Sequence, residues 1–220
     1  MSNYRHIINH RLKHIYFVFD DKGTLVIKSP KISQKKIEAL LLSKTSWIQA
    51  SLKKFQNKKG KTLDFTNILE LYYLGVCYPL KLIQYDKKRV KLEFDTQGFT
   101  LFYHYYDEEL FQKYINLFYK KEAERYIPEK VAIFAKKMKL FPQKISFRKT
   151  KRQWGSCSGQ NNLSFNSMMM KLPKNVIEYI IVHELAHIKY KHHQKTFWKC
   201  VEDTLPGYKI QVKELKNYTT

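Results

Sequence analysis

Apolar residues in the first hundred positions recur in short runs bounded by polar residues, a pattern typical of β-strands. The run at 15–19 reaches the turn signal D-D-K-G at 20–23, and a second run at 25–27 follows, which predicts a hairpin. Between 33 and 52 the apolar residues recur at helical spacing instead. Further strands are predicted at 70–73, 78–84, 90–94 and 99–103. Residues 1–105 are therefore expected to form an N-terminal, antiparallel, β-rich unit with one helix.

After residue 105 the apolar period becomes that of helices. A long amphipathic helix is predicted from Asp107 onward, with acidic residues in its first turn as the helix dipole favours. Pro128 is expected to kink or split this helix. Strands are predicted at 145–149 and 162–166, and helices from Pro173 into the histidines and at 196–205. The expected fold class is α+β, with a second domain at 106–220.

The strongest chemical signal is the sequence His-Glu-Leu-Ala-His at 183–187, an H-E-x-x-H motif on a predicted helix. Residues four apart differ by ~40° around a helix axis, so His183 and His187 share one face. Two such imidazoles can bind one zinc ion, and Glu184 can take a proton from water that the metal activates. The apolar stretch 179–182 indicates a buried helix. Burying these polar residues without partners would be costly, which favours a shared metal ion.

A catalytic zinc ion usually takes a third protein ligand. His193 lies ten residues after His183, and ten helical residues would advance the chain by ~15 Å. The helix must therefore end near Tyr190, and the chain must double back. Metzincins with this spacing have a glycine where this chain has Tyr190, so the turn needs another geometry. His193 is the expected third ligand, while His192 and a carboxylate such as Glu202 remain alternatives.

A second motif, Trp154-Gly155-Ser156-Cys157, lies between two predicted strands. One interpretation is an edge strand or loop that lines the cleft, where the glycine lets a peptide backbone approach closely. The other is a turn anchored by a buried tryptophan. The substrate-binding candidates are Trp154, Gly155 and Ser156. Cys157 is not expected to be a nucleophile, because no separate base is apparent for it.

These motifs together resemble the YgjP-like family of zinc metallopeptidases, which is related to SprT-like and Wss1-like proteases. The matching residues are 183–187, His193, Phe197-Trp198, Arg152 to Ser158, Leu172-Pro173 and 176–182. The resemblance implies a gluzincin-like zincin core and one zinc ion per chain, held by the three histidines. It also implies that Glu184 is the general base and that the substrate is a peptide or protein.

Charge and composition allow a further partner. The chain has 41 Lys and Arg against 19 Asp and Glu, a net charge of +22 that would attract nucleic acid. A lysine-rich composition that runs evenly along the chain explains the excess without such a partner. Nucleic acid is therefore a possible partner, and charge alone does not identify one.

Cysteine usage and hydropathy indicate the compartment. Cys77, Cys157 and Cys200 form no C-x-x-C pair, which fits neither a disulfide framework nor a cysteine zinc ribbon. The N-terminus lacks the features of a signal peptide, and no apolar run approaches the ~20 residues of a membrane span. We expect a cytoplasmic protein with no membrane partner.

The leading hypothesis is a zinc-dependent metallopeptidase with Glu184 as general base, whose oxyanion is stabilised by zinc and by Tyr190, Tyr208 or a histidine. One alternative is a zinc-dependent nucleotide or phosphoester hydrolase, in which basic residues attract the phosphates. Another is a nucleic-acid-associated protein, either a DNA-stimulated protease or a binder with structural zinc.

Overall fold

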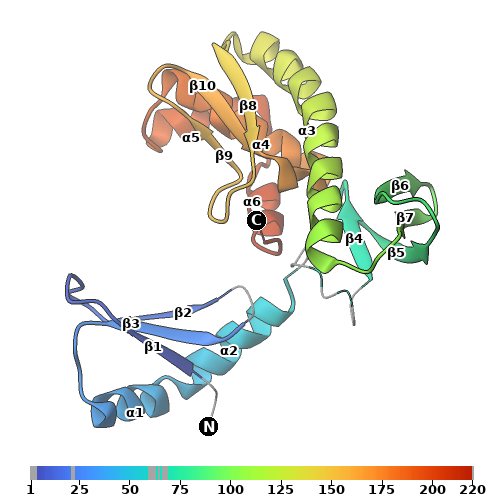
Figure 1. The fold of residues 1–220 in the computed structure, drawn as a ribbon. Helices are drawn as coiled ribbons and strands as arrows, with labels where there is room; N and C mark the ends of the chain where they lie inside the picture. Colours follow the sequence, from blue (N-terminus) through green and yellow to red (C-terminus); the bar gives the residue numbers. More distant parts are fainter. Residues whose placement is uncertain (1–3, 21–22, 59–62, 64, 66–68, 220) are drawn as a thin grey trace. The chain divides into compact units, whose positions relative to one another are not determined.

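The computed structural model describes residues 4–20, 23–58, 63, 65 and 69–219. Its contacts divide the chain into two compact units, 1–58 and 59–220 (Figure 1). Within the described residues the fold contains three sheets and six α-helices, which confirms the α+β class. None of the described helices combines the length and the apolar character that a membrane span requires.

The first unit is built on a three-stranded sheet in the order β1-β3-β2. Its strands are β1 (Tyr4–Ile8), β2 (Tyr16–Phe19) and β3 (Leu25–Ser29). Strands β2 and β3 form the predicted antiparallel hairpin, although turn residues 21–22 lie outside the described residues. Strand β1 pairs parallel to β3, so the expectation of a purely antiparallel unit is wrong. β3 is central because Leu25, Val26 and Ile27 are all buried and need cover on both faces.

The region 33–52, for which the sequence predicts one helix, contains two helices. They are α1 (Gln34–Ser43) and α2 (Thr45–Gln56), and Lys44 separates them with non-helical dihedral angles, φ −108° and ψ 10°. Ser33 caps α1 by accepting a hydrogen bond from the Lys36 N–H. The Trp47 ring of α2 packs edge-on against Phe17 of β2 at 6.3 Å between centroids. The break therefore lets α2 lie along the sheet.

The second unit begins with a four-stranded sheet in the order β4-β5-β7-β6. Its strands are β4 (Glu70–Tyr73), β5 (Val76–Gln84), β6 (Lys91–Asp95) and β7 (Gly98–Tyr103). Strand β7 pairs parallel to β5, a second departure from the antiparallel prediction. Phe99 and Leu101 of β7 are at most 1% exposed, whereas β6 alternates between partly buried and exposed residues. Burial therefore places β7 inside the sheet and β6 at its edge.

This sheet packs on α3 (Glu108–Met138), which explains why the structural division falls earlier than the predicted boundary at residue 105. The rings of Tyr73 and Phe99 contact Phe118 of α3 at centroid distances of 5.5 and 5.2 Å. The Tyr119 hydroxyl donates a hydrogen bond of 2.7 Å to the Tyr72 carbonyl. Strands β4 to β7 thus share a core with the C-terminal half of the chain. The predicted boundary that assigns residues 106–220 to a domain of their own stays a prediction.

Helix α3 continues through Pro128, so the expectation that this residue might split it is wrong. Asp107 caps the helix by accepting from the Leu110 N–H at 3.0 Å. Proline removes one backbone hydrogen bond from the helix interior. The flanking side chains Ile127 and Val131 are at most 2% exposed, and their packing in the core keeps the backbone helical.

The remaining elements surround the histidine-bearing helix. They are β8 (Lys144–Arg148), β9 (Gly155–Cys157), β10 (Asn162–Asn166), the 3-10 helix η1 (Ser167–Lys171), α4 (Lys174–Lys189), α5 (Lys195–Thr204) and α6 (Lys209–Leu215). The sheet order is β8-β10-β9, with β10 parallel to β8 and antiparallel to β9. Strand β9 is thus an edge strand, and it lies beside α4.

Lys171 at the end of η1 provides a test of this core. Burial lowers the pKa of Lys171 to about 8, the nearby charge of Lys149 adds to the effect, and the ammonium lies 5.7 Å from the Tyr119 ring centroid. The unfolded chain holds the lysine proton up to its ordinary pKa near ~10.4, so it binds more protons than the folded chain between the two values. Stability from this group therefore rises with pH across that interval.

We expect the free energy of unfolding of wild type, relative to Lys171→Met, to increase between pH 7 and pH ~10. Urea unfolding of both proteins at several pH values measures the difference. Lys120→Met is the control, because the Lys120 side chain is half exposed and pairs with Glu124 on the surface of α3. A difference between wild type and Lys171→Met that stays constant with pH would contradict the burial of a charged lysine here.

Candidate metal centre

Helix α4 carries the H-E-x-x-H residues at the point where it leaves the core. In the preceding turn Ile180, Ile181 and Val182 are at most 3% exposed. His183 and His187 are only partly buried, whereas Glu184 between them is 6% exposed. The helix is thus buried by its apolar residues and turns two imidazoles toward one opening, as the four-residue spacing predicts.

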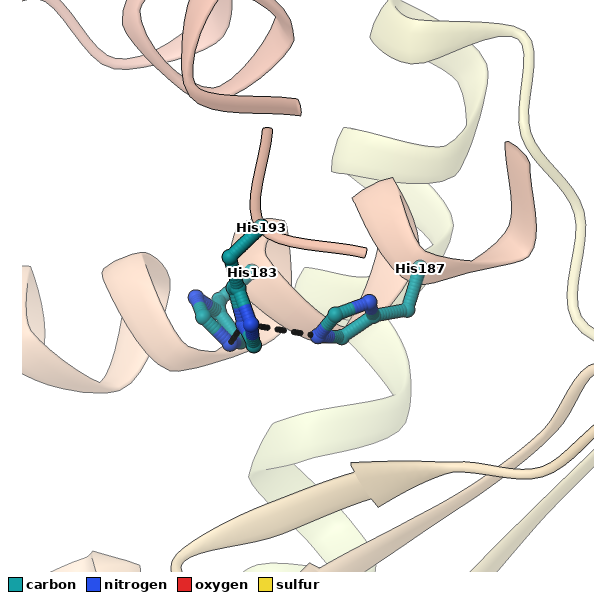
Figure 2. A group of neighbouring side chains, drawn as sticks. All are labelled: His183, His187 and His193. Atoms are coloured by element: carbon teal, nitrogen blue, oxygen red, sulfur yellow. Dashed lines mark hydrogen bonds between the residues drawn. The ribbon is translucent and has the colours of Figure 1, made fainter. Parts of the chain in front are cut away.

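Three imidazole nitrogens converge on one point (Figure 2). His193 Nε2 lies 3.1 Å from His183 Nε2 and 3.1 Å from His187 Nε2. These ligand atoms all lie within 4.8 Å of one another, a group that could hold a metal ion. Tetrahedral zinc with Zn–N bonds of ~2.0–2.1 Å would place neighbouring nitrogens ~3.3 Å apart. The donor set and its spacing therefore fit zinc.

The outer nitrogens of the two helical histidines also have partners. His187 Nδ1 lies 2.9 Å from the Tyr190 carbonyl oxygen, which can only accept, so Nδ1 carries the proton and Nε2 presents its lone pair. His183 Nδ1 lies 3.4 Å from the Tyr179 hydroxyl, one helical turn earlier. Burial raises the pKa of Tyr179 to about 12, which keeps this hydroxyl protonated at neutral pH. Both contacts orient the rings toward the shared point.

The chain reversal that brings His193 to the site uses no glycine. Helix α4 ends at Lys189, and Tyr190 takes extended dihedral angles, φ −116° and ψ 99°, which any residue adopts. The Gln194 N–H then donates to the His192 carbonyl at 2.9 Å, a γ-turn with His193 at its centre. At this turn the His193 side chain lies between α4 and α5, with its ring against Phe197 and Trp198 of α5 and its Nε2 beside the two histidines of α4.

A stack of aromatic rings supports the third histidine. Trp198 of α5 stacks on His193 with centroids 5.4 Å apart, and its Nε1–H donates to the His193 carbonyl at 3.1 Å. Tyr208 lies between Trp198 and Tyr179, nearly parallel to both, at 5.4 and 5.9 Å. Tyr179 is also the partner of His183. The stack therefore links the supports of two metal-ligand candidates on different helices.

Glu184 points at β9, where only glycine leaves enough room for it. A Cβ atom on Gly155 would lie 2.7 Å from Glu184 Cγ and 2.8 Å from its Oε1. One interpretation of the sequence links this glycine to the approach of a substrate backbone. The structure shows that it accommodates the Glu184 side chain, which places the carboxylate against the edge strand.

The electrostatic environment favours neutral histidines. Burial lowers the pKa of His183 to about 3, and the neighbouring imidazoles of His187 and His193 add to the effect. Burial also lowers the pKa of His187, partly opposed by its hydrogen bond to Tyr190. Neutral imidazole is the form that binds a metal ion. Burial raises the pKa of Glu184 to about 7.

Other sequence candidates lie elsewhere or have other partners. His192 is exposed and lies outside the three-histidine group. Glu202 Oε1 accepts a hydrogen bond from the Gly207 N–H at 3.0 Å, so this carboxylate stabilises the end of α5. Trp154 is half-buried against the core, and the Ser156 hydroxyl contacts Arg148. Of the alternatives for the third ligand, the described structure brings only His193 to the other two.

Two supporting residues were missed in the sequence. Tyr179 precedes His183 by four residues, a spacing that places them on one helix face, so the pair was detectable. For Tyr208 the sequence predicts only a role as one candidate donor to the oxyanion. Its stacking between Tyr179 and Trp198 depends on how α6 folds back, and no local pattern indicates that.

Comparison with known proteins identifies the family of the chain. The family model described as "YgjP-like, metallopeptidase domain" matches residues 13–218. The zymogen of the metallopeptidase abylysin from Pyrococcus abyssi is 21% identical, with a TM-score of 0.36 over 40% of this chain and 93% of its own. The zymogen of jannalysin from Methanocaldococcus jannaschii is 23% identical, with a TM-score of 0.37 over 41% and 91%. The search of curated proteins finds no match. The family model matches nearly the whole of the present chain, which therefore belongs to the YgjP-like metallopeptidase family.

Proposed function

We propose that this hydrolase is a zinc-dependent peptidase in which His183, His187 and His193 hold the ion and Glu184 is the general base. The observation that carries the proposal is the convergence of the three Nε2 atoms beside a buried carboxylate at the edge of a sheet. A gluzincin-like core, with its ligands on α4 and the following turn, is the matching proposal for the fold.

The chain supplies the proton transfers and the positioning. When bound, zinc acts as a Lewis acid toward water and toward a substrate carbonyl. Glu184 accepts the proton of the attacking water on its carboxylate and later donates it to the leaving amine. Its burial and its contact with Gly155 hold the carboxylate in one place, so little reorganisation is needed during the reaction.

The edge strand supports a peptide as the substrate. One edge of β9 pairs with β10, and no described strand pairs with the other edge. Backbone groups at such an edge can pair with an extended peptide. Because Gly155 of β9 touches Glu184, a peptide aligned on β9 would bring a carbonyl to the base. Trp154, Gly155 and Ser156 are the proposed substrate contacts.

A nucleotide or phosphoester hydrolase is the second candidate. Two cationic side chains, Arg148 and Lys191, lie beside β9 and its turn and would attract phosphates. A nucleotide has no extended backbone to pair with the edge of β9, which favours the peptide. Stimulation by nucleic acid remains a prediction that rests on net charge.

Replacing the proposed base tests the function directly. Glu184→Gln removes the proton acceptor while keeping the side-chain volume. We expect unchanged zinc content and a loss of peptidase activity of about 10²- to 10⁴-fold. The matched control is Glu178→Gln on the same helix, because Glu178 faces Lys130 at 3.9 Å and lies away from the site. Zinc content and the kcat/KM for casein-derived peptides are measured beside the hydrolysis of nucleoside triphosphates. Full peptidase activity in Glu184→Gln would refute the role of Glu184 as general base. Hydrolysis of triphosphates without cleavage of peptides would refute the substrate class.

Gly155→Ala tests the contact between the edge strand and the base. The added methyl group would displace Glu184, and an error of about 1 Å in placement can cost about 10² in rate. We expect kcat to fall by about that factor with zinc content unchanged. Gly159→Ala is the control, since a Cβ atom there meets nothing within 4 Å. Equal kcat values for the two variants, with equal thermal stability, would show that the contact does not matter.

A further inference from the structure

The net charge of the chain is concentrated in two segments. Residues 1–58 contain 12 Lys and Arg against 3 Asp and Glu, and residues 130–201 contain 15 against 2. Basic and acidic residues are equal in number in 59–129, 11 of each, and in 202–220, 3 of each. Basic residues are spread fairly evenly along the chain, whereas acidic residues are scarce in these two segments, one of which contains the candidate metal centre.

The basic segment 130–201 contains β9, all three converging histidines and only two carboxylates. Glu178 is paired with Lys130 at 3.9 Å, and Glu184 is the proposed base. No other acidic side chain of this segment balances its cations. Glu108 and Glu109 of α3 line one pocket with Arg148, but four basic residues line it too, Lys113, Lys120, Arg148 and Lys149. An anionic group arriving at β9 would meet a positive field.

Arg148 lies on the outer face of the sheet beside β9. Successive side chains of a strand point to opposite faces, and the Cβ position of Gly155 faces Glu184. Ser156 therefore points to the opposite, outer face, where its hydroxyl accepts a hydrogen bond of 3.0 Å from Arg148 Nη2. The exposed guanidinium thus reaches across the sheet to the edge strand.

Lys191 lies at the other end of β9. It comes from the connection between α4 and α5, and its ammonium donates to Asn161 Oδ1 at 2.7 Å and approaches the Ser158 carbonyl at 3.4 Å. Both partners belong to the turn between β9 and β10. Among the described residues neither Arg148 nor Lys191 forms an ion pair with a carboxylate. Their hydrogen-bond acceptors are neutral groups, so both side chains keep a net positive charge that a substrate can meet.

We propose that the peptidase prefers acidic peptides, with Arg148 and Lys191 as its specificity-determining residues. An extended peptide on the edge of β9 would direct alternate side chains to the outer face, where Arg148 meets a carboxylate. Carboxylates near the β9–β10 turn would meet Lys191. A nucleic acid offers similar charge without a backbone that pairs with the strand, so an acidic polypeptide is favoured. This inference rests on the proposed peptidase function.

The test uses three peptides that share one neutral scissile region and carry Glu, Gln or Lys in the flanking positions. We expect kcat/KM of the zinc-loaded protein to be about fivefold higher for the Glu peptide than for the Gln peptide, and lower still for the Lys peptide, as for exposed ion pairs. The preference should weaken as salt is raised from ~0.05 to ~0.5 M. Equal cleavage of all three peptides would overturn the acidic preference and leave the peptidase standing. Cleavage of none, with zinc bound, would overturn the peptidase itself.

Substitutions of Arg148 and Lys191 test whether these two side chains cause the preference for acidic peptides. Lys191→Gln keeps a hydrogen-bond donor and should reduce the Glu preference, while Arg148→Glu should reverse it in favour of the Lys peptide. Lys88→Glu, in the exposed connection between β5 and β6, makes the same change in net charge as Arg148→Glu and should leave the preference unchanged. A loss of rate for all peptides without reversal in Arg148→Glu would contradict its role. Suppression of all cleavage by single-stranded DNA, with no peptide preference, would assign the cations to nucleic acid instead.

Discussion

Helix α4 is buried along most of its length, yet one turn of it must present two imidazoles and a carboxylate to the same opening. Buried polar groups need partners, and each of the two helical histidines has one. Tyr179 and the Tyr190 carbonyl orient His183 and His187, and Gly155 leaves room for Glu184. A metal ion shared by the three Nε2 atoms would satisfy their lone pairs, which links the proposed metal site to the packing of α4.

Helix α4 is flanked by α5 on one side and by strand β9 on the other, and the two have different roles. Helix α5 and the aromatic stack of Trp198, Tyr208 and Tyr179 hold the turn that carries His193. On the opposite side the edge strand β9 approaches the carboxylate closely enough that a single methyl group would disturb it. The three histidines thus face a strand edge, and we propose that the charges beside that edge determine which substrates bind.

Much of this was accessible from local pattern. The four-residue spacing of His183 and His187 predicted a shared helix face, and the rise of a helix required a chain reversal before His193. Most strand positions also followed from short apolar runs. The parallel pairings of β1 and β7, and the packing of β4 to β7 on α3, depend on contacts between distant residues. The stacking of Tyr208 and the close approach of Gly155 to Glu184 likewise depend on residues that are distant in the sequence.

Metal binding by His193 rather than by its neighbour His192 is the most direct test of the account, because only His193 lies with His183 and His187 in the described structure. Metal content of the purified protein should be about one zinc ion per chain for wild type and for His192→Ala. His193→Ala should lose most of its zinc while keeping its fold. Retention of zinc by His193→Ala together with its loss from His192→Ala would contradict the proposed centre.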